Sequence, residues 1–452
     1  MSLKIIAVLA VSISLFSTIS ADEVTIHSIA ELRQYAAKDG NHVTMTPGTY
    51  HLKKSDRPAK PGTPAIDFTG DGNTFDFTGV TLEVDNTYYN ANTYRNLLRI
   101  AGNDNLFKNL VVRDIGSLHT EGGLLLVFGG VSNTVDGFAF YPKGSTPYGY
   151  GSLFGKGGNP LVKLKKKSCI KIEGENSILR NTTIIARSYG HCVAMQGSIN
   201  TLIENCTIEG EMVRTNDILK ETEGLPAELN YMTAWGYPIP PDHVISCQEA
   251  GIRTYPSGKI TYLDNITRET RDVVVRNCTV KRVREGITIS DASGKKLVTG
   301  CVVLDCETAY QMSEGVIEDC IANFKHGPVF ANYANWHSKG EATIHVLHDE
   351  PVENAYTLAF ITSTGIDLTL ISQGAETYGT DIPIVFAGND MSVRHGEWQI
   401  DTASKNNLVN MTSHPVILRE NATDNTVKSL GPVTDHGSGN KVNHLQTTVR
   451  NL

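Results

Sequence analysis

The segments Ser177-Ile-Leu-Arg-Asn181 and Thr201-Leu-Ile-Glu-Asn205 share one pattern: a short aliphatic run, one charged residue and a closing asparagine. A second short run follows the asparagine, as in Cys206-Thr-Ile208. Alternating runs of this kind predict β-strands with one side chain inward and the next outward. Asparagine tolerates the left-handed backbone of a tight bend. The pattern therefore predicts two short strands joined at a sharp corner.

Copies of this pattern recur along the chain. Their closing residues are Asn109, Asn181, Asn205, Asn277, Gly300 and Asp319. From Asn181 onward these residues follow one another at intervals of 24, 72, 23 and 19 residues. An interval of 19 to 24 residues is what one solenoid coil of three short strands requires, and the long interval is three times that length. One coil cannot bury its inward face alone, so the coils must stack in parallel. The sequence predicts an all-β chain folded as a right-handed parallel β-helix.

The repeat also predicts the domain organisation. It is clear over residues 40–330, with an opening coil over 43–52 and a short helix over 30–37. Residues 141–158 and 217–241 break the period and predict inserted loops, because they are rich in Gly, Pro and aromatic residues. Residues 335–452 have strand-like runs with poor fidelity, so they predict degenerate coils or a capping region. We expect a single β-helix domain over residues 22–452.

The N-terminus has the order of a secretory signal peptide. Lys4 precedes an apolar stretch from Ile5 to Phe16, and small residues follow before Asp22. This predicts a signal peptide over residues 1–21 and a secreted or periplasmic mature protein. No later segment is apolar enough to span a bilayer. A membrane partner is not expected.

The charge balance gives no general attraction for nucleic acid. The formal net charge is −8, whereas nucleic-acid binding relies on a basic footprint. The densest basic run is Lys163, Lys165, Lys166 and Lys167, which we interpret as a solvated edge or turn.

Two residue types predict ladders inside the stack. Cys206, Cys278, Cys301 and Cys320 each follow a closing residue, so four of the eight cysteines should stack as buried small side chains rather than form disulfides or a metal site. Asn181, Asn205 and Asn277 stand in glycosylation sequons. We interpret them instead as an internal asparagine ladder.

The asparagine-terminated repeat resembles right-handed parallel β-helix proteins, a group that includes pectate lyases, polygalacturonases, alginate and chondroitin lyases and phage tailspikes. The resemblance implies a polysaccharide partner and says little about the reaction. The paired-Asp and Gly-His pattern of polygalacturonases is not present as such. The only Arg-His-Gly, at Arg394 to Gly396, lies outside the clear coils.

Aligning the coils by their closing residues predicts one functional face. With Asp242 taken as a further closing residue, Gly190, Gly251 and Gly286 fall into one register. Neighbouring turns then bring together Arg187, Tyr189, His191, Arg214, Asp217, Glu249, Arg253, Arg284 and Glu285. The 217–241 loop carries Tyr231 and Trp235, which can wall a groove with aromatic surfaces suited to sugar rings.

This set contains the groups that β-elimination on a uronic-acid polysaccharide needs. We expect His191 to be the base or carboxylate neutraliser and Tyr189 the acid or base, with Arg214 and Arg253 as substrate clamps. The expected substrate contacts are Arg187, Arg284, Glu285, Tyr231 and Trp235.

Three alternatives stay open. Asp217 and Glu249 can instead bind Ca²⁺, although no cofactor is certain. A hydrolase would use two carboxylates drawn from Asp217, Glu249 and Glu285. A noncatalytic glycan-binding protein would use the long loop as its contact surface. The oligomeric state stays open.

Overall fold

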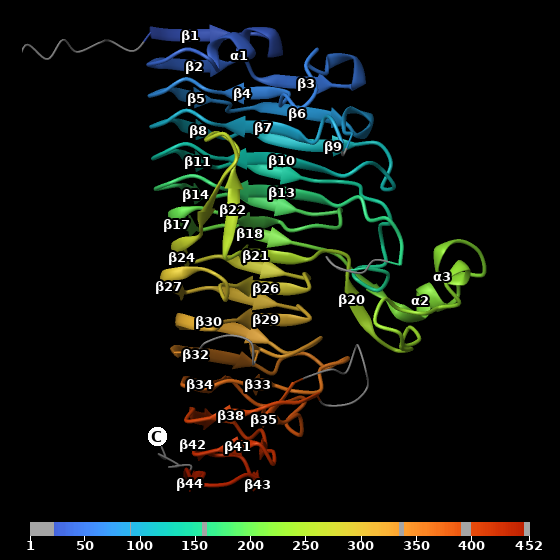
Figure 1. Cartoon of the computed structure of the whole chain (residues 1–452), viewed down its shortest axis with the longest axis vertical. Coiled ribbons are helices and arrows are strands. Elements are labelled where there is room, and N and C mark those ends of the chain that lie inside the picture. The colour runs from blue at the N-terminus through green and yellow to red at the C-terminus, as the bar shows by residue number, and fades with distance from the viewer. Residues whose placement is uncertain (1–21, 91, 156–160, 334–338, 390–398, 447–452) are drawn as a thin grey trace, which may run out of the picture.

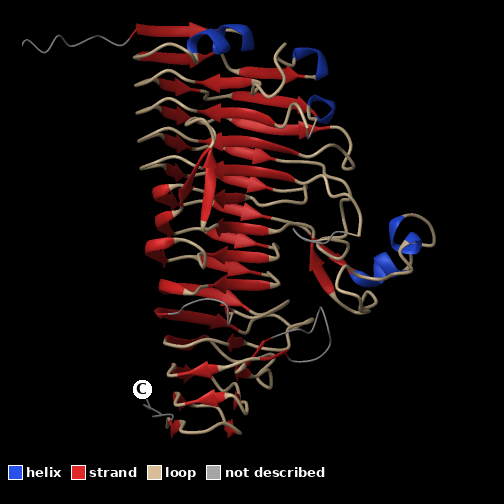
Figure 2. Cartoon of the chain, viewed as in Figure 1, coloured by secondary structure: helices blue, strands red, loops and turns tan. Residues whose placement is uncertain are grey.

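The computed structural model describes residues 22–90, 92–155, 161–333, 339–389 and 399–446. The chain winds into a tall pile of coils, most of which contribute three short strands (Figures 1 and 2). Strands of successive coils pair in parallel and form three stacks, of which the first two join in one sheet. The predicted parallel β-helix is confirmed. The expected signal peptide, residues 1–21, lies outside the described residues.

Stack 1 consists of β1 (Asp22–Ile26), β2 (Asn41–Met45), β5 (Thr74–Asp76), β8 (Leu106–Lys108), β11 (Thr134–Asp136), β14 (Ile178–Arg180), β17 (Ile199–Glu204), β24 (Arg271–Arg276), β27 (Ser293–Thr299), β30 (Glu314–Asn323), β32 (Lys339–Leu347), β34 (Ile366–Gln373), β39 (Asn407–Met411), β42 (Thr426–Ser429) and β44 (Lys441–His444). Stack 2 consists of β3 (Gly48–Leu52), β6 (Val80–Asp85), β9 (Val111–Ile115), β12 (Ala139–Tyr141), β15 (Thr183–Ile185), β18 (Thr207–Glu209), β25 (Thr279–Lys281) and β28 (Val302–Leu304), and then joins β30.

Stack 3 consists of β4 (Ile66–Phe68), β7 (Asn96–Ile100), β10 (Gly123–Phe128), β13 (Lys167–Ile172), β16 (Val193–Met195), β21 (Ala250–Thr254), β26 (Glu285–Thr288), β29 (Thr308–Gln311), β31 (Phe330–Asn332), β33 (Ala359–Ile361), β35 (Ile384–Phe386), β40 (Val416–Leu418) and β43 (Val433–Asp435). The remaining elements are α1 (Ile29–Tyr35), η1 (Lys54–Asp56), η2 (Asn86–Tyr88), β19 (Met212–Arg214), α2 (Thr215–Leu219), α3 (Leu225–Glu228), β20 (Val244–Ser246), β22 (Ser257–Ile260), β23 (Ile266–Glu269), β36 (Gly388–Asn389), β37 (Gln399–Ile400), β38 (Ala403–Ser404) and β41 (Ala422–Thr423). No described helix is both long and apolar enough to cross a membrane.

The corners between stacks 1 and 2 have the backbone that the repeat predicts. Each of the six closing residues has a positive φ, between 51° and 63°. Their flanking strands send aliphatic side chains into one continuous core, as Leu179, Ile203 and Val275 do on successive coils. Burying an aliphatic side chain of this kind contributes about 1.5–3 kcal/mol, so the inward ladders hold the coils together.

The predicted asparagine ladder exists, but at a different corner. Asn181, Asn205 and Asn277 are exposed, so their interpretation as an internal ladder is wrong. The buried ladder consists of Asn41, Asn73, Asn105 and Asn133, and a second one of Asn406, Asn425 and Asn440 ends the solenoid. In both ladders a side-chain amide donates to the next asparagine at 3.0–3.1 Å. The closing residues suit the corner because the corner requires a left-handed backbone. This requirement concerns the backbone only, so it does not predict that their side chains are buried.

The cysteine ladder is confirmed. Cys206, Cys278, Cys301 and Cys320 lie on consecutive coils and are buried, and all eight cysteines are free thiols. The backbone N–H of Cys278 contacts Sγ of Cys301 at 3.5 Å. The cysteines therefore fill the core as small side chains.

The interval of 72 residues is one coil and not three. Leu202 on β17 pairs directly with Val274 on β24, so everything between them is added to a single coil. One addition is a lateral insertion, residues 211–247, which projects from the solenoid with α2 and α3 (Figure 1). It shares a small hydrophobic core with the 141–158 loop through Leu153, Phe154, Ile218, Ile239 and Ile245. The other is the β22–β23 hairpin. Beyond residue 339 the strands continue the same stacks as far as β44.

Candidate functional site

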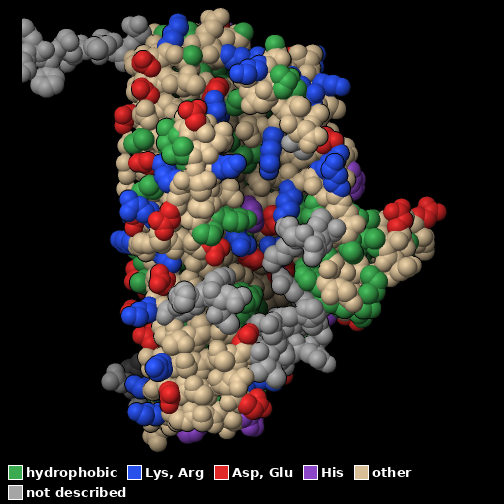
Figure 3. Space-filling model, viewed as in Figure 1, with side chains coloured by type: hydrophobic (Ala, Val, Ile, Leu, Met, Phe, Trp, Pro, Cys, Tyr) green, Lys and Arg blue, Asp and Glu red, His purple; other side chains and the backbone are tan. Residues whose placement is uncertain are grey.

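The outer face of stack 3 carries a pocket of about 180 Å³, here called the central pocket. Figure 3 shows basic, acidic and histidine side chains gathered in the hollowed middle of this face. The residues that line the pocket are Arg95, Leu124, Lys166, Ser168, Ile170, Lys171, His191, Ala194, Gln196, Glu249 and Tyr255. They come from strands β7 to β21 and the corners beside them, so consecutive coils build one surface.

The β22–β23 hairpin is attached to the coils that carry the central pocket. Arg268 donates from Nε to the Gly197 carbonyl and from Nη2 to the Glu173 carbonyl, each at 2.6 Å. Lys171 donates from Nζ to the Lys259 carbonyl at 2.7 Å. The hairpin is thus fastened to the coils of β13 and β16 beside the pocket.

His191 and Tyr255 lie next to each other in this pocket. Nε2 of His191 is 2.6 Å from Oη of Tyr255, and Nδ1 accepts a hydrogen bond from the Ala250 backbone at 3.3 Å. A backbone N–H can only donate, so the proton of the neutral ring sits on Nε2. The pKa of His191 is lowered to about 4, mainly by burial, while Glu249 opposes the shift and Arg253 adds to it. His191 is therefore a neutral donor to Tyr255, and the lone pair that a base needs faces the backbone.

Glu249 is held as a carboxylate. Its Oε1 accepts from Lys166 Nζ at 2.6 Å, and its Oε2 lies 3.4 Å from His191 Nε2. Burial alone raises the pKa of this carboxyl, but His191, Arg284 and Lys166 together bring it to about 2. Glu249 has no proton to give near neutral pH.

An ion-pair chain lies beside the pocket. Glu285 accepts from Arg253 Nη1 at 2.7 Å and from Arg284 Nη2 at 3.1 Å. The Arg253 guanidinium lies over the Tyr255 ring, 5.0 Å from its centre. Asp291 contacts Arg253 Nη2 at 3.7 Å, and burial raises the pKa of its carboxyl.

The structure brings together five of the predicted site residues: His191, Glu249, Arg253, Arg284 and Glu285. Tyr189 is buried behind them and donates its hydroxyl to the Gly155 carbonyl at 3.2 Å, so it does not line the pocket.

The other predicted residues lie elsewhere. Arg187 is exposed and pairs with Glu211 at 3.3 Å, and Arg214 pairs with Glu353 at 3.2 Å. Tyr231 donates to the Glu221 carbonyl within the lateral insertion, and the Trp235 ring stacks on Tyr237 there. The aromatic residues belong to the insertion and do not line the central pocket.

The lateral insertion explains two errors of the alignment: Arg214 and Asp217, counted from Asn205, lie in it, and so does Asp242. Asp242 closes no coil, so the alignment that used it is shifted. Val193 pairs with Ile252, which puts Gly190 opposite Glu249 and not opposite Gly251. Because Arg214 and Asp217 were aligned through the insertion, they appeared to share a face with His191.

The donors expected for Ca²⁺ do not form a ligand set. Asp217 lies on α2, is exposed and pairs with Lys220 at 2.9 Å, whereas Glu249 is occupied by Lys166 and His191. Within the described ranges no group of three or more His, Cys, Asp or Glu residues is arranged to hold a metal ion. The residues therefore do not fit the expected Asp217 and Glu249 site.

Most of the residues that line the central pocket were not predicted from the sequence, among them Tyr255, Lys166, Arg95 and Lys171. Tyr255 follows Arg253 by two positions, so strand alternation puts both on the outer face. Lys166 was assigned to a solvated basic run, and this interpretation is wrong for it and for Lys167. Lys166 reaches into the pocket, and Lys167 is fully buried against Asp114 at 2.8 Å.

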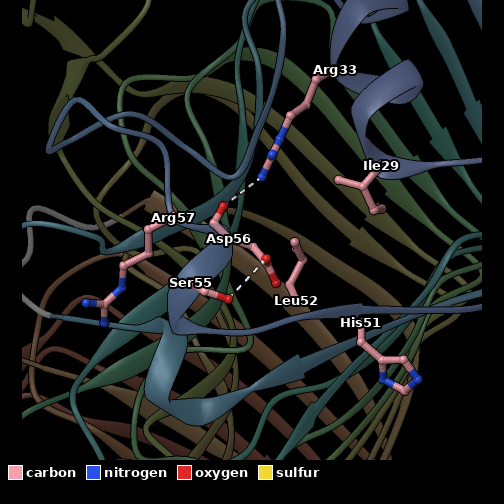
Figure 4. Close-up of a pocket in the computed structure, with 7 residues that line it drawn as sticks. All are labelled: Ile29, Arg33, His51, Leu52, Ser55, Asp56 and Arg57. Carbon is pink, nitrogen blue, oxygen red and sulfur yellow. Dashed lines mark hydrogen bonds between the residues drawn. The ribbon is translucent and has the colours of Figure 1, made fainter.

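A second hollow at the N-terminal end has a structural role (Figure 4). Arg33 donates from Nη2 to the Asp56 carbonyl at 3.0 Å and from Nε to the Ala65 carbonyl at 2.8 Å. Ser55 donates to the Asp56 carboxylate at 3.3 Å. These bonds fasten α1 and η1 over the first coils. The polar groups of Arg33, Ser55 and Asp56 therefore bind one another and the backbone.

Neither a family model nor a curated protein matches this sequence. Solved structures do resemble it. The A-module of a mannuronan C-5 epimerase from Azotobacter vinelandii has 10% identity and a TM-score of 0.42, with 92% of this chain and 93% of that chain covered. A PL6 alginate lyase in complex with a trisaccharide has 11% identity and a TM-score of 0.43, covering 94% and 85%. A tailspike protein of E. coli bacteriophage HK620 has 8% identity and a TM-score of 0.46, covering 92% and 75%. At these values the likenesses concern the fold and carry no argument about the reaction.

Proposed function

We propose that the central pocket binds an anionic, uronic-acid-containing polysaccharide and cleaves it by β-elimination, with Tyr255 as the proton-transfer residue. The observation that carries the proposal is the pairing of Tyr255 with His191, whose Nε2–H is directed at the phenol oxygen. A donor held there stabilises the phenolate form of Tyr255. The Arg253 guanidinium over the ring acts in the same direction.

The reaction needs one group that first takes and then gives a proton. The Tyr255 phenolate, formed by loss of its proton to solvent, removes the proton on C5 of the uronate. The electron pair forms the C4=C5 double bond, and the bond between C4 and the glycosidic oxygen breaks. The Tyr255 phenol then protonates the departing oxygen. The products are a 4,5-unsaturated uronide and a free hydroxyl on the leaving sugar.

Cations around Tyr255 match a negatively charged substrate. Arg95, Lys166 and Lys171 line the pocket, and Glu249 is the one carboxylate among its lining residues. Arg95 is exposed and is available to pair with a substrate carboxylate. Such pairing stabilises the charge that develops on the carboxylate when the C5 proton leaves.

The hydrolase alternative has weaker support. A hydrolase requires a carboxylic acid that is protonated at working pH beside a second carboxylate. Glu249, with a pKa of about 2, has no proton to donate, and Glu285 accepts hydrogen bonds from two arginines. Asp291 has a raised pKa, but it does not line the central pocket.

The test is turnover on pectate, alginate, glycosaminoglycans and neutral polysaccharides, with and without Ca²⁺. We expect ultraviolet absorbance from an unsaturated uronide with at least one uronic polymer. Reducing ends without absorbance would replace the proposal with hydrolysis. Binding without either product would replace it with a glycan-binding function. We also propose that the mature chain acts outside the cytoplasm, which secretion assays on the full-length chain can test.

A further inference from the structure

We propose that a second pocket, near the N-terminal end of the same face, binds a further sugar unit of the same anionic polysaccharide. The proposal rests on the proposed function and goes beyond it, because it predicts a substrate several sugar units long. This corner pocket has a volume of about 570 Å³ and is lined by Lys54, Arg57, Asp85, Asn86, Thr87, Tyr89, Asn90, Gly116, Ser117, His119, Thr120 and Glu121. Volumes of roughly 300–1,000 Å³ are usual for ligand pockets.

The corner pocket is built by three successive turns between stacks 2 and 3. These turns lead into β4, β7 and β10, so the pocket is centred on the coil of β7. His191 precedes β16, which lies three coils further along stack 3. At about 4.8 Å per coil, the two sites are about 14 Å apart along the axis. A pyranose in an extended chain advances by about one coil, so the corner pocket would hold a sugar about three units from the cleaved bond.

The floor of the corner pocket rests on a buried cation. Lys167 Nζ donates to Asn86 Oδ1 at 2.6 Å and to Asp114 Oδ2 at 2.8 Å, and it lies 3.7 Å from the centre of the Tyr89 ring. Tyr89 in turn donates to Asp114 Oδ1 at 2.8 Å. Such a fully satisfied buried network is costly to desolvate and fixes the positions of its members. Two of those members, Asn86 and Tyr89, are the floor.

The start of β13 connects the two pockets. Lys166 reaches into the central pocket and binds Glu249, whereas the next residue, Lys167, supports the corner pocket floor. Leu124 of β10 lines the central pocket, and Glu121, three residues earlier, lines the corner pocket. One polysaccharide chain running along the axis can therefore occupy both.

The free groups of the corner pocket indicate the chemistry of its ligand. Lys54 is exposed and has no ion-pair partner among the described residues, and the side chain of His119 is also exposed. The lining carboxylates are already engaged, since Asp85 accepts from Thr87 at 2.6 Å and Glu121 binds Lys165. Arg57 donates to three backbone carbonyls. Lys54 is thus the cation available for a sugar carboxylate, and the neutral polar residues can bind hydroxyls.

The test compares long and short substrates. The test pair is Lys54→Ala, which removes the cation at the corner pocket, and His119→Glu, which opposes it. The control pair makes the same changes on exposed residues of the last coils, as Lys428→Ala and His436→Glu. We expect kcat/KM on the polymer to fall about 5- to 20-fold in the first pair, as for loss of one charge-assisted contact. The shortest cleavable oligosaccharide and the control pair should show wild-type values. Equal losses on polymer and short oligosaccharide, or no loss on either, would overturn the proposal.

Binding without turnover separates this proposal from the proposed function. Native gel electrophoresis through pectate, alginate or chondroitin sulfate measures retardation whether or not the polymer is cleaved. Retardation that His119→Glu weakens and His436→Glu does not would support the corner pocket even if no uronide formed. Retardation that His119→Glu leaves unchanged, or no retardation by any of these polymers, would overturn it.

Discussion

Nε2 of His191 lies 2.6 Å from Oη of Tyr255, while Nδ1 of the same ring accepts the Ala250 backbone N–H at 3.3 Å. Ala250 begins β21 and Tyr255 directly follows its last residue, while His191 lies two residues before β16 on the neighbouring coil. The parallel register therefore fixes both hydrogen bonds and the tautomer with them. His191 positions the phenol, and Tyr255 is the residue that can exchange protons with a substrate.

Replacing Tyr255 with phenylalanine should abolish elimination. The substitution keeps the ring over which Arg253 lies and removes only the group that transfers the proton, so kcat should fall about 10²- to 10⁴-fold with little change in KM. Tyr262→Phe, in the β22–β23 hairpin, is the matched control, because its hydroxyl makes two long hydrogen bonds, to the Gly130 carbonyl at 3.4 Å and from Arg268 Nη2 at 3.5 Å. Ultraviolet product formation measures both variants. Wild-type turnover by Tyr255→Phe would remove it from the mechanism.

The pH profile of turnover should rise toward alkaline pH. Burial raises the pKa of Tyr255, and Arg253 opposes that effect. The phenolate is thus a minor form near neutral pH, and kcat/KM should increase about tenfold per pH unit below the pKa. Arg253→Gln removes the opposing charge, raises the pKa of Tyr255 and should shift the profile to higher pH. A flat profile, or a shift in the opposite direction, contradicts the assignment.

Protonation of His191 should destabilise the fold. Burial lowers the pKa of His191 to about 4 from its ordinary 6.5. Between these two pH values the unfolded chain is protonated at His191 and the folded chain is not. The free energy of unfolding should therefore decrease as pH falls from about 6.5 to about 4. Urea unfolding at pH 7 and pH 5 measures this change. His191→Gln should reduce the decrease without removing it, because burial also lowers the pKa values of His326, His348 and His414. An identical decrease in the variant would contradict the lowered pKa.

The fold could be predicted because its signal is local. A closing residue at each corner and aliphatic runs on both sides repeat often enough to give the coil length. The interval between Asn205 and Asn277 could not be divided correctly, because an insertion of the right length imitates further coils. Only the pairing of Leu202 with Val274 shows that the chain returns to the next coil.

The site was harder to predict because it depends on register across coils. His191 was found because it follows the recognisable corner at Asn181. Glu249 and Arg253 were found because the register of Gly251 with Gly286, which the alignment used, is correct. Tyr255 could have been found by extending the strand alternation of Arg253 by two residues. The direction of the Lys166 side chain could not be predicted, because two consecutive lysines at the start of β13 serve different pockets. Composition alone predicts that both are solvated.

Lys166 should matter for binding more than a lysine in a comparable ion pair outside the pockets. Lys166→Ala removes a cation from the central pocket and leaves Glu249 buried without its 2.6 Å partner, so the net charge near the substrate becomes more negative. KM for an anionic polymer should rise about tenfold. Lys325→Ala removes the same charge from a partly exposed pair with Glu350, outside both pockets, and is the matched control. Initial rates over a range of polymer concentrations distinguish them, and equal KM values would show that Lys166 does not contact substrate.

The two kinds of asparagine should differ in their effect on stability. Asn105 accepts from the Asn73 backbone at 2.9 Å and donates to Asn133 at 3.1 Å, all within the buried ladder. Asn105→Ala leaves these groups unpaired, so it should cost about 2–4 kcal/mol in the free energy of unfolding. Asn181→Gly keeps the left-handed corner, where φ is 52°, and loses only an exposed hydrogen bond to Asp136. That substitution should change stability by less than about 1 kcal/mol. Urea denaturation measures both, and similar losses in the two variants would mean that the corner asparagines stabilise the stack through their side chains as well.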